Sequence, residues 1–235
     1  MKINSDDVIS IILARGGSKG LKNKNLRKLH GKPLIYYPIN AAIKSKYIGH
    51  VIVSTDSKKI SETAKKYGAI VPFIRPKKLS GSFSTTEKTL QHTLINYEKI
   101  IKRKFKICVF ITATDIFRNN SWIDQCIEYL YKHKDIESAF YGYKTSKNYW
   151  EFKNKKWIRL KKWMRVYSSR QIRKTIVRED TGLACASRSE LWRKGKRIGD
   201  KVKIFINEDS FSHIDIHTLE DLKLANAAKI IRKIK

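Results

Sequence analysis

A cluster of glycines and basic residues near the start of the chain could bind phosphate. The segment RGGSKGLKNKN runs from Arg15 to Asn25 and places Gly16, Gly17 and Gly20 among Lys and Arg side chains. Glycines let the backbone approach a ligand closely and turn its amide groups toward one point, which is how anion-binding nests form. The spacing matches neither the Walker loop nor the GxGxxG turn of dinucleotide enzymes. The loop therefore indicates an anion site of another kind, and a basic turn without a ligand is the alternative.

The elements that must position this loop are short strands alternating with helices. We expect strands at residues 8–13, 51–55, 70–74, 107–112 and 137–141, and helices near 34–46, 57–67, 84–103 and 120–133. Continuous apolar runs are typical of strands covered on both faces, and the alternation predicts an α/β fold with a mostly parallel sheet flanked by helices. The glycine loop directly follows the first strand, at the carboxyl end where open α/β sheets bind ligands.

The alternation stops after residue 141. An insertion of hairpin or irregular character is expected at about 142–178, where tryptophans and basic residues follow no clean period. Strands are expected again at 182–187, 202–206 and 211–216, and a helix from about residue 218. Because no linker or repeat interrupts the chain, residues 1–235 are predicted to form a single domain.

The chain carries a formal net charge of +30, which favours anionic ligands without selecting one class of them. The three cysteines, Cys108, Cys126 and Cys185, have no spacing typical of a disulfide framework or a zinc site. No apolar stretch approaches the length of a membrane span. We therefore expect a cytoplasmic protein without a membrane partner.

Five ordered segments resemble one family, the acylneuraminate cytidylyltransferases, which make CMP-sialic acid and related CMP-nonulosonates. The most specific is ILARGGSKGLKNKNLRKLHGKPLI, from Ile12 to Ile35. The others are IVSTDS at 52–57, RPKKLS at 75–80, TGLACAS at 181–187 and DIHTLEDLKLA at 215–225. The resemblance implies a Rossmann-like nucleotidyltransferase fold whose insertion mediates dimerisation.

The same resemblance implies a reaction in which the anomeric hydroxyl of an acidic 2-keto sugar attacks the α-phosphate of CTP and pyrophosphate leaves. Arg15 and Lys24 would hold the triphosphate and, with Asp215, form the catalytic set. The implied nucleotide-binding residues are Arg15, Gly16, Ser18, Gly20, Lys24, Asn25, Arg75 and Thr86, with Asn25 directed at the ribose. Ser84 and Glu87 also have the spacing of a helix-capping box.

A magnesium site is implied at the end of a late strand, where the family carries two aspartates two residues apart. This chain has Asp215 and His217 there. Imidazole is a poor ligand for Mg²⁺, so we expect Asp115, just past a central strand, to supply the second carboxylate. A cap on the next turn is the alternative role for Asp115, and a surface or core position is the alternative for His217.

The sugar site is implied at Thr112, Arg170 and Thr181, with basic residues of the insertion contributed by the partner subunit of a homodimer. Thr181 and Cys185 stand where sialate enzymes carry Asn and Tyr, so the substrate could be a deoxygenated nonulosonate such as legionaminate or pseudaminate. Two alternatives stay open. One is a cytidylyltransferase for an eight-carbon 3-deoxy acid, and the other is an inactive relative that binds nucleic acid through its basic, aromatic insertion.

Overall fold

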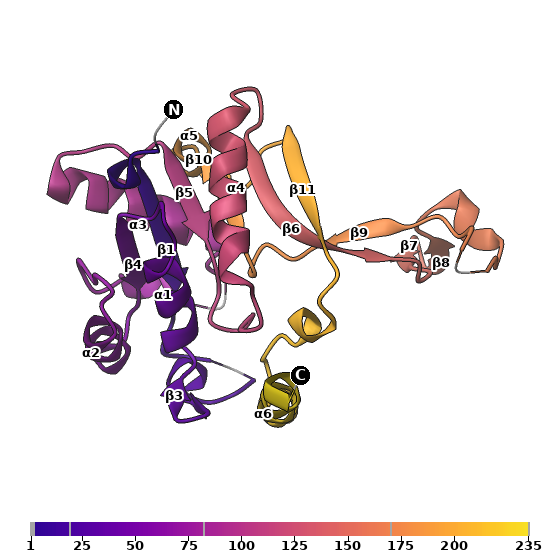
Figure 1. Cartoon of the computed structure of the whole chain (residues 1–235), viewed down its shortest axis with the longest axis horizontal. Coiled ribbons are helices and arrows are strands. Elements are labelled where there is room, and N and C mark those ends of the chain that lie inside the picture. Colours follow the sequence, from indigo (N-terminus) through magenta and orange to yellow (C-terminus); the bar gives the residue numbers. More distant parts are fainter. Residues whose placement is uncertain (1–2, 19, 82, 170, 235) are drawn as a thin grey trace.

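The computed structural model describes residues 3–18, 20–81, 83–169 and 171–234, with side chains to residue 231. Its centre is a seven-stranded sheet (Figure 1). Six strands follow the order β11-β6-β10-β5-β1-β4, and β9 pairs with β6 outside this path. The strands are β1 (Val8–Leu13), β4 (His50–Ser54), β5 (Ile107–Phe110), β6 (Ser138–Thr145), β9 (Ile176–Glu179), β10 (Cys185–Arg188) and β11 (Val202–Asn207).

The sheet is mostly parallel, as predicted. Strand β1 pairs in parallel with β4 and β5, and β11 pairs in parallel with β6. Strand β10 is antiparallel to both β5 and β6, so β5 and β6 run in the same direction on either side of it. Only β9 and β10 therefore oppose the other strands of this sheet among the described residues.

Helices cover both faces of the sheet. They are α1 (Tyr36–Ile43), α2 (Lys58–Lys66), α3 (Thr86–Ile101), α4 (Asn120–Lys132), α5 (Ser189–Arg193) and α6 (Leu219–Ile234). Alternate residues of a strand point to opposite faces: Val8 and Ile12 of β1 pack with α1, α2 and α4, whereas Ile9 and Ile11 pack with α3 and α5. All four are fully buried. This arrangement explains the continuous apolar run of the first strand.

A third apolar cluster packs the C-terminal helix against the glycine loop near the N-terminus. Helix α6 contributes Leu222, Ala225 and Ala228, which pack with Leu21 of the glycine loop and with Ile216. The short strand β2 (Lys28–Leu29) contacts the same helix and pairs with β3 (Lys32–Pro33). Residues 214–218 are thereby brought to the glycine loop.

The predicted strand at 70–74 is wrong. It is extended chain with isolated bridges from Ile70 to Ile52 and from Ile74 to Thr55. Pro72 lacks an N–H to donate to a ladder, and Ile70 and Ile74 are exposed at this edge. Proline thus prevents a continuous strand where hydrophobicity alone predicted one.

The predicted strand at 211–216 is also wrong. A 3₁₀ turn, η5 (Ser210–His213), forms there because the Asp209 side chain accepts from the Phe211 amide at 2.9 Å. Such side-chain to backbone bonds compete with strand pairing. The strand predicted at 182–187 begins only at Cys185, after a turn in which the Leu183 amide donates to the Asp180 carbonyl at 3.0 Å.

Residues 145–169 and 171–178 form an arm that projects from the body of the molecule (Figure 1). At its end lie the hairpin strands β7 (Trp150–Lys153) and β8 (Lys156–Arg159), joined by Asn154 and Lys155 with φ of 51° and 59°. Left-handed backbone at both central residues is typical of the tight hairpin turn. The remaining short 3₁₀ turns are η1 (Ser5–Asp7), η2 (Lys24–Leu26), η3 (Lys77–Leu79) and η4 (Lys162–Arg165).

In the described part of the chain, no helix combines the length and the apolar character that a membrane span needs.

Candidate active site

A cavity of about 610 Å³ opens at the carboxyl ends of β1 and β5. Its lining includes eight of the residues predicted for the site, namely Arg15, Ser18, Gly20, Lys24, Asn25, Arg75, Thr86 and Thr112. His217 lines it as well. Gly16, Asp115, Asp215 and Thr181 are not part of this lining. Asp115 contacts Thr112 and Asp215 contacts His217, both of which line the cavity. Arg170 and Lys19 lie outside the described residues.

The glycine loop is held from two sides. The Gly16 amide donates to Oδ1 of Asp56 at 2.8 Å, which ties the loop to the chain after β4. On the other side, a Cβ added to Gly20 would lie 2.7 Å from the carbonyl oxygen of His217. Glycine is therefore required at position 20 by close approach of the C-terminal segment.

Lys24 and Arg15 place two cations in the cavity wall. Burial lowers the pKa of Lys24, Asp215 and Asp115 act in the opposite direction, and Arg15 lowers it further. Asn25 is buried, and its Nδ2 donates to the Arg15 carbonyl at 3.0 Å. Although Asn25 borders the cavity, its amide thus also holds the glycine loop in place, a role that the sequence did not indicate.

Arg75 is a buried cation with unused donors. Only 5% of the residue is exposed, and within the described chain its Nε and Nη2 atoms have no hydrogen-bond partner. The Asp56 carboxylate is 3.8 Å from Nη2, too far for a hydrogen bond. Burial lowers the pKa of Arg75. Because buried donors without partners are costly, an acceptor that reached these atoms would stabilise the guanidinium.

The first turn of α3 forms the adjacent wall through Ser84, Thr85, Thr86 and Thr89. The sequence predicted Ser84 as the N-cap of α3, but the N-cap is the next residue, Thr85. The Thr85 hydroxyl accepts from the Lys88 amide at 3.2 Å, whereas the Ser84 hydroxyl donates to the Lys78 carbonyl at 2.9 Å.

Asp115 is held in the loop between β5 and α4. Its Oδ2 accepts from the hydroxyl of Thr112, and a Cβ added to Gly182 would lie 2.0 Å from that oxygen. Burial raises the pKa of Asp115, and the Asp215 carboxylate raises it further. The two carboxylates are thus close enough to interact, although no sequence spacing relates them.

Arg118 fixes this loop, and the sequence did not mark it as functional. It is buried, with Nε donating to the Leu183 carbonyl at 2.8 Å and Nη2 to the carbonyls of Thr112 at 2.6 Å and Gly182 at 2.9 Å. Burial lowers the pKa of Arg118 to about 10, and Asp115 acts against that change. Its position behind Asp115 depends on tertiary contacts that its place in the sequence does not reveal.

Asp215 and His217 are hydrogen-bonded to each other and do not lie on a strand. His217 Nε2 lies 2.7 Å from Oδ2 of Asp215, and the His217 amide donates to Oδ2 of Asp221 at 2.9 Å. Residues 214–217 belong to no strand. The predicted positioning by a β-pleat is therefore wrong, and packing of α6 on the loop positions Asp215 instead.

The donor set fits a magnesium ion held mainly by phosphates. Among the residues that the structure describes, no group of three or more His, Cys, Asp or Glu side chains could hold a metal by itself. Mg²⁺ keeps several waters and needs only one or two carboxylates beside substrate phosphates. Asp115 and Asp215, which interact electrostatically with each other and with Lys24, meet that requirement.

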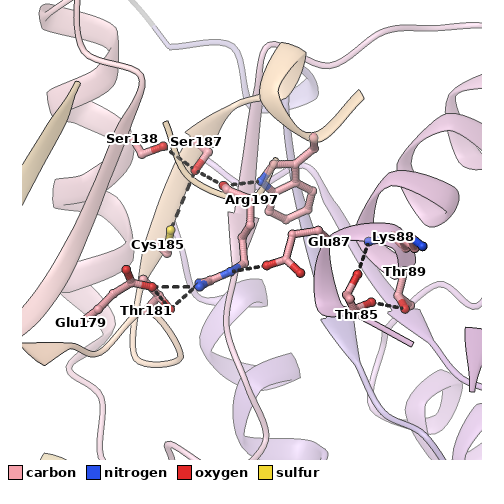
Figure 2. Close-up of polar contacts among 11 residues, drawn as sticks. Thr85, Glu87, Lys88, Thr89, Ser138, Glu179, Thr181, Cys185, Ser187 and Arg197 are labelled. Carbon is pink, nitrogen blue, oxygen red and sulfur yellow. Dashed lines mark hydrogen bonds and ion pairs between the residues drawn. The ribbon is translucent and has the colours of Figure 1, made fainter. Parts of the chain in front are cut away.

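Thr181 belongs to a polar network with Arg197 and Glu179 (Figure 2). Its hydroxyl accepts from Nη1 of Arg197, and it lies 3.4 Å from Oε1 of Glu179. Arg197 packs on the ring of Phe110, which lines the cavity. Sequence reasoning missed Arg197, since it stands in a run of Lys and Arg with no distinguishing spacing.

Comparison with known proteins identifies the family. A family model described as cytidylyltransferase matches residues 9–228. The chain belongs to the cytidylyltransferase family. This confirms the family resemblance that the glycine loop and the later motifs predicted.

Curated relatives of known name match part of the chain. A CMP-N,N'-diacetyllegionaminic acid synthase of Campylobacter jejuni is 37% identical over 108 residues, covering 46% of this chain and 46% of the relative. An N-acylneuraminate cytidylyltransferase of Escherichia coli is 35% identical over 121 residues, covering 52% of this chain and 27% of the relative. The matched region thus spans about half or less of the length of these curated relatives.

A solved CMP:2-keto-3-deoxy-manno-octonic acid synthetase complexed with CTP has the same fold. Its TM-score is 0.71 at 12% identity, covering 96% of this chain and 99% of that one. This likeness supports the nucleotidyltransferase fold and does not define a substrate.

Proposed function

We propose that this chain transfers CMP from CTP to the anomeric hydroxyl of an acidic nine-carbon 2-keto sugar and releases pyrophosphate. Membership of the cytidylyltransferase family and the relatives that act on nonulosonates support this reaction. The observation that carries the nucleotide half is Arg75, a buried guanidinium with unpartnered donors, in one cavity with Arg15 and Lys24.

The proposed roles follow from charge and position. Arg15, Lys24 and the amides of the glycine loop would neutralise the triphosphate, whose charge shifts onto the leaving pyrophosphate as the sugar oxygen attacks. Arg75 and the first turn of α3, including Thr86, would receive the cytidine. Catalysis would then rest on positioning and on charge stabilisation.

We further propose that Asp115 and Asp215 hold Mg²⁺ with the phosphates of CTP. The ion would act as a Lewis acid and offset negative charge on the phosphate oxygens. A bound ion would offset the repulsion from Asp215, which adds to the effect of burial in raising the pKa of Asp115.

The sugar is proposed to lie beyond the triphosphate, toward Thr112 and Thr181. This placement follows from the position of Thr112 in the cavity lining and from the packing of Asp115 on Gly182, next to Thr181. Arg170, proposed for the sugar carboxylate, lies outside the described residues.

We propose a homodimer built through the arm. Large apolar side chains of the arm are exposed in the single chain, including Trp157 at 66%, Val166 at 69% and Tyr167 at 84%. Burial of such side chains against a second copy would remove a costly exposed surface. We also propose a reducing, cytoplasmic location, supported by the three free buried cysteines.

The deciding experiment measures pyrophosphate release with Mg²⁺, each of the four nucleoside triphosphates and a panel of 2-keto sugar acids. We expect release with CTP and a nine-carbon acid. Release with an eight-carbon acid alone would transfer the proposal to that substrate. No release with any acid, together with tight and salt-sensitive RNA binding, would support a nucleic-acid-binding relative instead.

A further inference from the structure

Arg197 contacts Glu87, Glu179 and Thr181 (Figure 2). Its Nη1 donates to the Thr181 hydroxyl, its Nη2 donates to Oε1 of Glu179 at 2.8 Å, and its Nε lies 3.5 Å from Oε1 of Glu87. The guanidinium carbon also lies 5.2 Å from the centroid of the Phe110 ring. Phe110 lines the cavity, so Arg197 lies directly behind the wall.

The backbone of Arg197 is fixed as firmly as its side chain. Its carbonyl accepts from Nε1 of Trp192 at 2.9 Å and from the hydroxyl of Ser187 at 2.8 Å. The preceding turn is tied to α3, because Nε2 of Gln91 donates to the Arg193 carbonyl at 2.7 Å. The guanidinium therefore extends from a rigid base.

We propose that Arg197 is a positioning residue that holds the nucleotide side and the sugar side of the cavity in one arrangement. On one side it binds Glu87, which follows Thr86 in the first turn of α3. On the other it binds Thr181, next to Gly182, on which Asp115 packs. The assignment of these two sides rests on the proposed function.

The geometry requires a guanidinium rather than a positive charge alone. The three acceptors lie around one planar fork, which Arg can satisfy together and the single ammonium of Lys cannot. Because Arg197 donates to Thr181, the proton of the Thr181 hydroxyl is directed elsewhere, toward Glu179 or a substrate acceptor. Arg197 thus fixes the direction in which Thr181 can donate.

The test compares Arg197→Met and Arg197→Lys with a matched control, Arg193→Met. Arg193 stands in the same segment and also binds α3, through Glu98 at 2.6 and 3.0 Å. Unlike Arg197, which packs on Phe110, Arg193 makes no hydrogen bond, ion pair or ring contact within the described chain with a residue that lines the cavity. The measurements are the Kd of CTP by calorimetry, the KM of the sugar acid and the Tm. Where Arg193→Met does not fold, Arg193→Lys serves as the control.

We expect Arg197→Met to raise the Kd of CTP and the KM of the acid, each by about 10-fold, since a lost hydrogen bond to a charged group changes binding on that order. Arg197→Lys should not restore either value. Thr181→Val should raise the KM of the sugar acid and leave the Kd of CTP unchanged. The double variant Thr181→Val/Arg197→Met should have the same KM for the acid as Arg197→Met, because the two residues act through one contact. Arg193→Met should lower the Tm and leave both constants unchanged.

An Arg197→Met protein that differs from the wild type only in Tm, as the control does, would overturn the proposal. So would full rescue by Arg197→Lys, since charge alone would then suffice. A wild-type protein that binds CTP but turns over no acid would refute the proposed function. In that case the Kd of CTP, measured in Arg197→Met and in Arg193→Met, still tests the role of Arg197. An equal Kd in the two variants would overturn the positioning role of Arg197.

Discussion

Gly182 tests whether the position of Asp115 matters to the reaction. In Gly182→Ala the new Cβ would lie 2.0 Å from Oδ2 of Asp115, 2.8 Å from its Cγ and 2.9 Å from Oγ1 of Thr112. Ordinary van der Waals contact begins at 3.4 Å. If the carboxylate alone gives way, its oxygen moves by 1.4 Å to reach ordinary contact, the difference between 3.4 and 2.0 Å.

Two consequences of that movement can be estimated. Overpacking of a buried site costs about 1–3 kcal/mol, which for a chain of this length lowers the Tm by roughly 2–4 °C for each kcal/mol. A displacement of about 1 Å at a reacting group can reduce turnover by about 100-fold. We therefore expect a moderate loss of stability, a large loss of kcat and a higher Mg²⁺ requirement.

The assay combines three readouts: the Tm, pyrophosphate release as a function of Mg²⁺, and Mn²⁺ binding in the presence of CTP by electron paramagnetic resonance. Gly17→Ala is the stability control, since a Cβ there meets no atom within 4 Å. Wild-type Mg²⁺ dependence and Mn²⁺ affinity in Gly182→Ala would refute the reasoning. They would show that the site tolerates displacement of Asp115.

Three further predictions concern charge. Arg75→Met should raise the Kd of CTP by about 10- to 150-fold, as expected for hydrogen bonds to a charged group. The Tm without ligand should change little, because removal of the buried donors that lack hydrogen-bond partners offsets the loss of the 3.8 Å ion pair with Asp56. Calorimetry showing unchanged CTP affinity would exclude Arg75 from the nucleotide site. The raised pKa of Asp115 means that its contribution to stability is fully present below the unfolded value of 3.8 and is lost as the pH rises through the folded value. Asp115→Asn should therefore raise the Tm of the unliganded protein near pH 7.5 and reduce Mg²⁺-dependent turnover, and near-normal turnover would remove Asp115 from the metal site. In residues 144–178 Glu151 is the sole acidic residue among many Lys and Arg. Two arms in contact therefore repel each other, and added salt should strengthen the dimer by screening that repulsion. Sedimentation equilibrium at low and high salt measures the dimer's dissociation constant, and dissociation of the dimer on adding salt would contradict the prediction.

The elements that the sequence predicted correctly are those with a local signal. The first strand, the glycine loop and the helices near α1 to α4 follow from apolar periodicity and glycine spacing, which depend on neighbouring residues. The errors at 70–74 and 211–216 arose where one residue changed the backbone pairing. Pro72 removed a donor, and the Asp209 side chain captured the amide that a strand would have used.

The same distinction applies to the site. The glycine loop and the basic residues within it could be predicted because they lie on one continuous segment with the chemistry of a phosphate site. Asp215 could be placed only by resemblance, and its neighbour His217 turned out to be its hydrogen-bond partner. Arg118 and Arg197 could not be found, since each acts through contacts with segments more than 60 residues away, Leu183 and Gly182 for Arg118 and Glu87 for Arg197.

By itself, the sequence determined that the chain forms an α/β sheet with an anion-binding loop after its first strand, because strand, helix and turn preferences are local. Only the tertiary structure decided which distant side chains meet at that loop. Packing of α6 on Leu21 brings Asp215 to the glycine loop, and packing of Gly182 against Asp115 joins the loop after β5 to the turn before β10. Contacts of this kind depend on how the layers close on one another, and spacing along the chain does not encode that closure.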